Sequence, residues 1–249
     1  MENPLVSIII PSHNRFEGLL IALKSIKKQS FTDYEVIIIN DGSDDERYQT
    51  YHFDKNFKVL HLEKNSVVEK GYFSDSIRNH GINKATGKYI AFLDDDDYWF
   101  SNKLELQIDK LETSELKMTC SEATSNYGYY DENSQNKLFN DQIVFKEISK
   151  IYKNSSMKRE FQKKGLYNFQ YPSIWTSKFI KIHNCIITSS VVVEKNLLDK
   201  IGNFRDIQSK KLWADWDCWL GLLTHTDSYY FSDPLLYYNL SDGLNSKPQ

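Results

Sequence analysis

The chain has 249 residues, of which 40% are hydrophobic and 26% are charged, and its formal net charge is -3. This length is enough for one sizeable hydrophobic core and suits a single large α/β domain. A weakly acidic balance argues against a nucleic-acid-binding protein, which would usually carry a basic surface. The three cysteines, Cys120, Cys185 and Cys218, are too few and too far apart for a disulfide framework or a zinc site, so we expect buried thiols.

The first 111 residues alternate short β-branched runs with amphipathic segments. The run Leu5–Ile10 predicts a strand that is buried on both faces and that ends at Pro11. Apolar residues at helical spacing then predict a helix over residues 16–26. Further strands are predicted at Tyr34–Ile39, Phe57–Leu62 and Lys88–Leu93, and further helices at Phe73–Lys84 and Asn102–Leu111. This alternation predicts parallel strands joined by right-handed crossovers.

The second half is less regular. Residues 112–180 mix lysine, asparagine and aromatic residues, with weak helical spacing near Val144–Tyr152. A strand is predicted at Cys185–Val193, a helix at Lys195–Ile201 with Gly202 as its stop, a helix at Leu212–Leu223, and one or two short strands between Tyr229 and Tyr238. We expect this half to elaborate the same domain, so that residues 1–249 form one unit.

Polar side chains follow three of the predicted strands, in the segments Pro11–Arg15, Asn40–Asp45 and Asp94–Asp97. Ligands of open α/β sheets bind beyond the carboxyl ends of the strands, so these segments predict a site at one edge. Four successive carboxylates repel one another, and Mn²⁺ or Mg²⁺ would relieve that repulsion and could bridge to a diphosphate. The alternative is a solvated acidic turn in which Asp97 caps the next helix.

Four blocks of the sequence resemble the inverting family-2 glycosyltransferases with the GT-A fold. The blocks are Val6–Arg15, Asn40–Asp45, Arg78–Gly81 and Gly87–Asp97, and their order and spacing fit the family over roughly residues 5–110. The resemblance implies an α/β, Rossmann-like, three-layer α/β/α fold with a mixed, mostly parallel central sheet. It also implies that residues 1–111 bind the nucleotide-sugar and that residues 112–249 bind the acceptor.

The resemblance implies roles for individual positions. Pro11, Ser12, Asn14 and Arg15 would line the nucleotide pocket. Asp41 would accept a hydrogen bond from the base, typically uracil, and Arg78 would lie near the diphosphate. An ordinary turn at Asp41 and a surface ion pair at Arg78 are the alternatives.

The DXD motif of the family maps onto the aspartate run. Asp94 and Asp95 would contribute to the nucleotide-sugar site, with Asp94 toward the ribose, and Asp94 and Asp96 would hold the Mn²⁺ or Mg²⁺ ion. A shift by one residue, to Asp95 and Asp97, stays open.

Direct displacement at an anomeric carbon needs a base to take the proton of the acceptor hydroxyl. The segment 213–220 resembles the Glu-Asp motif of the family, which assigns the catalytic base to Asp215, although Ala214 replaces the glutamate. Asp217 is the alternative base, and it lies about 200° from Asp215 around a helix at roughly 100° per residue. Capping of the helix N-terminus is the structural alternative for Asp215.

Other residues near these motifs have two interpretations. Trp216 and Trp219 share a helix face and are expected in the core, whereas Trp213 is a candidate for stacking on a sugar ring. The pair His183–Asn184 is either structural or lies beside the diphosphate or metal. The lysines between Lys146 and Lys181 indicate a solvated face, or attract an anionic acceptor.

The sequence and the resemblance together therefore predict metal-dependent, inverting transfer of a sugar from a nucleoside-diphosphate sugar, with UDP as the expected nucleotide. The acceptor would be a hydroxyl of a glycan, lipid-linked or protein-linked molecule. A non-catalytic nucleotide-sugar-binding protein is the first alternative, because Ala214 departs from the motif. A nucleotidyltransferase is less favoured, since the segment Pro11–Arg15 contains no glycine. Exposed aromatic residues make a homodimer an open option.

The apolar segments bear on localisation. The longest apolar runs are far shorter than the ~20 residues that span a bilayer. Glu2 and Pro4 leave no basic segment of the kind that begins a signal peptide. We expect a cytoplasmic protein without a transmembrane segment, which would meet a membrane only at its periphery.

Overall fold

The computed structural model describes residues 3–66, 75–139, 171–181, 183–206 and 213–241. Within these residues the strands are β1 Val6–Ser12, β2 Tyr34–Asn40, β3 Phe57–His61, β4 Tyr89–Phe92, β5 Tyr98–Trp99, β6 Met118–Asn126, β7 Lys137–Leu138, β8 Ile174–Trp175, β9 Val192–Glu194 and β10 Ser228–Asn239. The helices are α1 Phe16–Lys27, α2 Arg47–Thr50, α4 Arg78–Ile82, α5 Lys103–Glu112, α8 Ser177–Ile180, α9 Lys195–Ile201 and α10 Ala214–Leu222, with short 3₁₀ helices η1 Asp75–Ile77 and η4 Thr188–Ser190.

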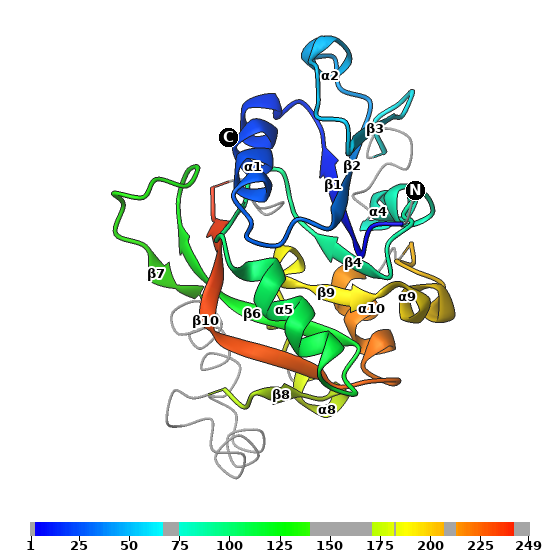
Figure 1. Ribbon diagram of the computed structural model, residues 1–249, viewed down its shortest axis with the longest axis vertical. Helices are drawn as coiled ribbons and strands as arrows, with labels where there is room; N and C mark the ends of the chain where they lie inside the picture. Colours follow the sequence, from blue (N-terminus) through cyan, green and yellow to red (C-terminus); the bar gives the residue numbers. More distant parts are fainter. Residues whose placement is uncertain (1–2, 67–74, 140–170, 182, 207–212, 242–249) are drawn as a thin grey trace.

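One mixed sheet joins all the described strands (Figure 1). Its order is β3-β2-β1-β4-β9-β6-β10-β5, with β7 added at β6 and β8 at β10. The ladders β1–β2, β2–β3, β1–β4 and β6–β10 are parallel, and each is longer than any antiparallel ladder. The predicted mixed, mostly parallel sheet is therefore confirmed. Both halves of the chain supply strands to it, while their assignment to donor and acceptor stays a prediction.

Helices cover both faces of the sheet, which gives the predicted three layers. On one face, Leu19 and Leu23 of α1 and Leu104 and Ile108 of α5 join one core cluster. Figure 1 shows α5 in front of β9 and β6 on this side. On the other face, residues of α4, α8, α9 and α10 join the second cluster, which includes the fully buried Trp219. The predicted core position of Trp219 is confirmed.

No strand was predicted within residues 112–180, and the structure places a long one there. Strand β6 runs through the middle of the sheet and pairs with β10 on one side and β9 on the other. Its sequence contains buried polar residues, which hide the apolar pattern of a central strand. These residues bond to neighbours: Tyr230 donates to Glu122 at 2.7 Å, and Gln107 donates to Thr119 at 3.0 Å.

The predicted strand Cys185–Val193 is wrong over most of its length. Residues 185–187 are irregular, 188–190 form η4, and only Val192–Glu194 pair as β9. The 3₁₀ helix η4 places Ser189 beside the aspartate run, where the Asp94 N–H donates to Ser189 Oγ at 2.9 Å. Trp99 Nε1 donates to Ser189 O at 2.8 Å and holds the same residue. Such long-range bonds leave no trace in local sequence.

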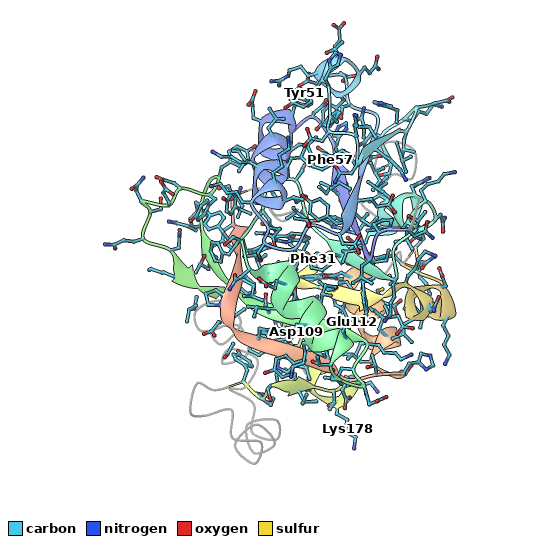
Figure 2. All side chains as sticks on the ribbon, in the orientation of Figure 1. Phe31, Tyr51, Phe57, Asp109, Glu112 and Lys178 are labelled. Carbon is cyan, nitrogen blue, oxygen red and sulfur yellow. The ribbon has the colours of Figure 1, made fainter. Side chains whose placement is uncertain are left out.

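Other boundaries differ by small amounts. Strand β1 continues through Pro11 to Ser12. Strand β4 pairs with β1 only as far as Ile9, so the missing N–H of Pro11 removes no hydrogen bond between these two strands. The tail forms one long strand, β10, with register shifts around Pro234. The helix α9 ends at Gly202 with φ +81, as predicted. The weak helical spacing at Val144–Tyr152 and most of the lysines from Lys146 onward lie outside the described residues, whereas Lys178 projects into solvent at the edge of the molecule (Figure 2).

Glu35 of β2 is a buried carboxylate that ties the parallel strands together. It accepts hydrogen bonds from Ser7 at 2.8 Å, from the N–H and hydroxyl of Thr86 at 2.8 and 2.6 Å, and from Lys58 at 2.7 Å. Burial raises the pKa of Glu35, but these bonds outweigh burial and hold its pKa at about 2.

We predict that Glu35→Gln lowers the free energy of unfolding by about 1–3 kcal/mol at pH 7, because charged hydrogen bonds are lost. A depressed folded pKa stabilises above the unfolded value near 4.5, and this contribution disappears as the pH falls toward 2. Urea unfolding at pH 7 and pH 3 should therefore show a smaller difference between variant and wild type at the lower pH. Equal stabilities at pH 7 would contradict the role of Glu35.

Candidate active site

The carboxyl ends of β1, β2 and β4 meet at one edge of the sheet. Ser12 Oγ at the end of β1 donates to Asp95 Oδ2 at 2.6 Å, and the Asp41 N–H after β2 donates to Ser12 O at 2.9 Å. The hydroxyl of Tyr48 also bonds to Ser12. The polar segments that follow the three strands are therefore brought together, as the sequence predicts.

The residues that follow Ser12 build one wall of this edge. Asn14 has a positive φ of 51, and its side chain accepts from the Asp44 N–H at 3.0 Å while its own N–H donates to Ser43 at 3.0 Å. Arg15 donates to Asp96 at 2.9 Å, and its side chain is 36% exposed. Pro11 is half-buried beside Ile39 of β2. The side chains of Asn14 and Arg15 thus lie at the surface of the site.

The carboxylate of Asp41 is held by the segment that follows β3. It accepts from Ser66 N at 2.8 Å, Ser66 Oγ at 2.7 Å and Asn65 Nδ2 at 3.1 Å, and Asp41 is 7% exposed. Gly42 has φ +65, and a Cβ there would lie 2.4 Å from Asn65 N, so this close approach requires glycine. Ser66 also lines a cavity of about 260 Å³, together with Ile77 and His80. The predicted contact of Asp41 with a base stays a prediction.

The four aspartates diverge into two pairs. Asp95 and Asp97 are buried, with 5% and 1% exposure, whereas Asp94 and Asp96 are half-buried, with side chains that are 30% and 12% exposed. Burial, followed by the charge of Asp96, raises the pKa of Asp95 to about 7. Burial also raises the pKa of Asp97 well above its usual range, and Asp97 accepts from the Asn239 N–H at 2.9 Å. The accessible pair is therefore Asp94 and Asp96, and the shift to Asp95 and Asp97 is disfavoured.

The accessible pair suits a divalent ion that completes its coordination with phosphate oxygens. Within the described ranges no cluster of three His, Cys, Asp or Glu could enclose an ion. Mg²⁺ commonly binds through one or two carboxylates together with water and substrate phosphates. Asp94 pairs with Arg78 and Asp96 with Arg15, and a carboxylate has further acceptor positions beyond one such bond. The donor set of this edge is compatible with Mn²⁺ or Mg²⁺.

Arg78 lies at the centre of a buried ionic cluster. Its guanidinium forms ion pairs with Asp75 of η1 and with Asp94, and its side chain is only 5% exposed. Burial lowers the pKa of Arg78, but the charges of Asp94 and Asp75 outweigh burial and keep it above the usual value. The alternative of a surface ion pair is wrong, because this arginine is buried.

Asp215 enters the same cluster from the first turn of α10. Asn184 donates to Asp215 Oδ2 at 3.0 Å, and the Trp216 N–H donates to Oδ1 at 2.6 Å, so the carboxylate also satisfies one free donor of the helix N-terminus. Burial, followed by the charge of Asp75, raises the pKa of Asp215 to about 7. The Asp215 N–H in turn hydrogen bonds to Asp75. Asp215 thus connects to Arg78 and Asp94 through Asp75.

The structure gives different surroundings to the two candidate bases on α10, Asp215 and Asp217, and to the tryptophans beside them. Asp217 pairs with Arg205, whose Nε lies 2.7 Å from Asp217 Oδ2, so it is engaged away from the cluster around Arg78. Trp216 is half-buried and donates to Ile180 O at 2.9 Å. Trp213 is 58% exposed immediately before α10. Of the two aspartates on this helix, Asp215 is the one that joins the cluster around Arg78, and its role as the base stays a prediction.

The family model of glycosyl transferase family 2 matches residues 7–186 of the chain. The chain belongs to glycosyl transferase family 2. One curated relative is WfgD of Escherichia coli, named a UDP-Glc:alpha-D-GlcNAc-diphosphoundecaprenol beta-1,3-glucosyltransferase. It is 36% identical over 136 residues, which are 54% of this chain and 50% of WfgD. Another is TuaG of Bacillus subtilis, named a putative teichuronic acid biosynthesis glycosyltransferase, which is 36% identical over 110 residues, or 43% of this chain and 41% of TuaG. The chain thus spans about half the length of these relatives.

Solved structures of TarS from S. aureus have the same fold. The structure of TarS 1–349 in complex with UDP-GlcNAc superposes with a TM-score of 0.66 at 19% identity, and the match covers 96% of this chain and 59% of that one. At this identity the likeness concerns the fold, and it confirms the predicted GT-A architecture. In the described part of this family 2 chain, no helix is long and apolar enough to cross a membrane.

Sequence reasoning missed several residues of the family 2 site. Asp75 and Ser189 had no assigned role, yet they hold Arg78 and the backbone of Asp94. For Asn184 the sequence left open a structural role or a place beside the diphosphate or metal, and in the structure its amide donates to Asp215. Only Asp75, three residues before Arg78 in a helical segment, carried a local signal, because that spacing favours an ion pair.

Proposed function

We propose that the protein transfers a sugar from a UDP-sugar to an acceptor hydroxyl, with inversion at the anomeric carbon and with Mn²⁺ or Mg²⁺ bound. The single observation that supports this best is the buried chain of contacts from Asp94 through Arg78 and Asp75 to Asp215. It joins the predicted diphosphate end of the donor to the predicted base. A UDP-linked donor is supported by two relatives, because WfgD is named for its use of UDP-Glc and TarS has been solved in complex with UDP-GlcNAc.

The donor end of this mechanism uses the strand edge. Asp41 would accept from the base imide, with Pro11, Ser12 and Asn14 around it, and Asp94 would face the ribose. Asp94 and Asp96 would hold the divalent ion, which when bound supplies positive charge to the leaving diphosphate. Arg15 and Arg78 would add charge of the same sign. Asp95 would contribute to the nucleotide-sugar site by holding Ser12 through their hydrogen bond and Arg15 through their ion pair.

The acceptor end uses Asp215 as the general base. Its carboxylate would take the proton of the acceptor hydroxyl as that oxygen attacks the anomeric carbon from the face opposite the diphosphate. Asn184 and the Trp216 N–H fix the carboxylate, and Trp213 is exposed where a sugar ring of the acceptor could stack. The acceptor would be a glycan, lipid-linked or protein-linked hydroxyl.

The raised pKa of Asp215 predicts a pH dependence. The base must be deprotonated, and its pKa is about 7, so kcat should rise about tenfold per pH unit below 7 and level off above it. Initial rates of UDP release between pH 5 and pH 9, at saturating donor and constant Mn²⁺, would measure this limb. A rate that stays constant from pH 5 to pH 9 would contradict the assignment.

A panel of nucleotide-sugars tests the function itself. UDP-linked sugars with Mn²⁺ should give release of UDP, faster with acceptor present, and chelation of the ion should stop it. Binding of a UDP-sugar without turnover, with the acceptor supplied, would instead favour a non-catalytic binding protein, the alternative that Ala214 raises. Release of pyrophosphate from a nucleoside triphosphate would favour a nucleotidyltransferase.

A further inference from the structure

The carboxyl end of β10 lies against the aspartate run. The Asn239 N–H donates to Asp97 Oδ1 at 2.9 Å, and the preceding residue, Tyr238, pairs with Ser125 of β6. Successive side chains of a strand point to opposite faces, so Tyr237 and Tyr238 face different surroundings. The Tyr237 hydroxyl donates to Gly128 O at 2.6 Å and is therefore used by the fold.

The hydroxyl of Tyr238 is not used in this way. The ring packs edge-to-face on Phe139, with ring centroids 5.1 Å apart, and lies partly buried against the core cluster that includes residues of α1 and α5. Among the described residues, however, the hydroxyl has no hydrogen-bond partner, and it is not one of the atoms that the fold seals from solvent. Tyr238 is half-buried and its hydroxyl reaches solvent, so this hydroxyl is available to a ligand.

The charges around Tyr238 indicate where that ligand lies. Burial raises the pKa of Tyr238, and the carboxylates of Asp97, Asp94, Asp96 and Asp215 raise it further. The hydroxyl therefore stays protonated at neutral pH and can donate. It lies near both the predicted donor acids and the predicted base, which is where the phosphate next to the transferred sugar would be.

We propose that Tyr238 is a donor-site residue whose hydroxyl donates a hydrogen bond to the β-phosphate of the bound nucleoside diphosphate. This inference rests on the proposed function, since it needs the diphosphate beside Asp94 and Asp96. The bond would hold the leaving group while the divalent ion neutralises its charge. The contact of the ring with Phe139 would help to hold the side chain in place.

Calorimetric titration of UDP and UMP in Mn²⁺ tests the proposal with wild type, Tyr238→Phe and Tyr237→Phe. Tyr238→Phe should weaken UDP binding about 10- to 100-fold, the range for a hydrogen bond to a charged group, and leave UMP binding unchanged because UMP has no β-phosphate. Its melting temperature should not change, because the lost hydroxyl had no partner in the fold. Tyr237→Phe should lower the melting temperature and keep the UDP affinity.

Three other outcomes would each contradict a different part of this proposal. If wild type binds UDP and Tyr238→Phe binds it equally well, the role of Tyr238 is wrong while the proposed function stands. If Tyr238→Phe weakens UDP and UMP to the same extent, the contact is not with the β-phosphate. If wild type binds neither nucleotide, the proposed function fails, and the inference fails with it.

Discussion

Replacing Asp215 by asparagine should lower kcat for sugar transfer by about 10²- to 10⁴-fold, the usual contribution of a positioned general base. Asparagine keeps the shape of the side chain, but its single amide oxygen can accept from only one of the two donors, Asn184 or the Trp216 N–H. It also cannot accept the proton of the acceptor hydroxyl. Affinity for UDP should stay near the wild-type value, because the donor is bound at the strand edge. Initial rates of transfer together with calorimetry of UDP would measure both quantities.

Asp217→Asn is the matched control, since it makes the same change two residues along the same helix. Asp217 pairs with Arg205, whose side chain is 63% exposed, so the loss of this pair should affect stability only slightly and activity hardly at all. Wild-type kcat in Asp215→Asn would rule out the assigned base. A large loss of kcat in Asp217→Asn, with none in Asp215→Asn, would show that Asp217 is the base.

Replacing Arg78 by methionine should reduce both stability and activity. The change leaves Asp75 and Asp94 without the buried guanidinium that neutralises them, and removal of one partner of a buried ion pair typically costs about 3–5 kcal/mol. Donor binding should weaken as well, because the charge next to the diphosphate is lost. Urea unfolding and UDP titration would measure the two effects.

Arg205→Met is the control for Arg78→Met, because Arg205 is an exposed arginine paired with a single aspartate. A second substitution, Asp75→Asn, in the Arg78→Met background should recover part of the lost stability, since one uncompensated carboxylate is removed. It should not recover UDP binding. An Arg78→Met protein as stable as wild type would show that the cluster does not depend on this charge.

The strand edge was predictable from the sequence because its signals are local. Buried β-branched runs set β1, β2 and β4, and the polar residues directly after each run must emerge at the same end of parallel strands. The divergence of the four aspartates was not predictable, because it depends on Ser12, Ser189 and Asn239, which are distant in sequence. Only these contacts distinguish the accessible Asp94 and Asp96 from the buried pair.

The acceptor half was harder to predict for a different reason. Strand β6 carries Thr119, Ser121 and Glu122 in buried positions, so neither alternation nor a continuous apolar run marks it as central. Its pairing with β10 joins residues more than a hundred positions apart. For Asp215 the family resemblance gave the position, whereas its connection to Asp75 and Asn184 became visible only in the fold.

The proposed function requires that the edge formed by β1, β2 and β4 binds a nucleoside diphosphate together with a divalent ion. Calorimetric titration of UDP with and without Mn²⁺, on wild type and on Asp96→Asn, tests this binding most directly. We predict tight binding of UDP to wild type that weakens at least tenfold when Mn²⁺ is removed, and weak binding to Asp96→Asn whether or not Mn²⁺ is present. UDP binding that is undetectable in wild type, or that is the same in all four titrations, would contradict the claim.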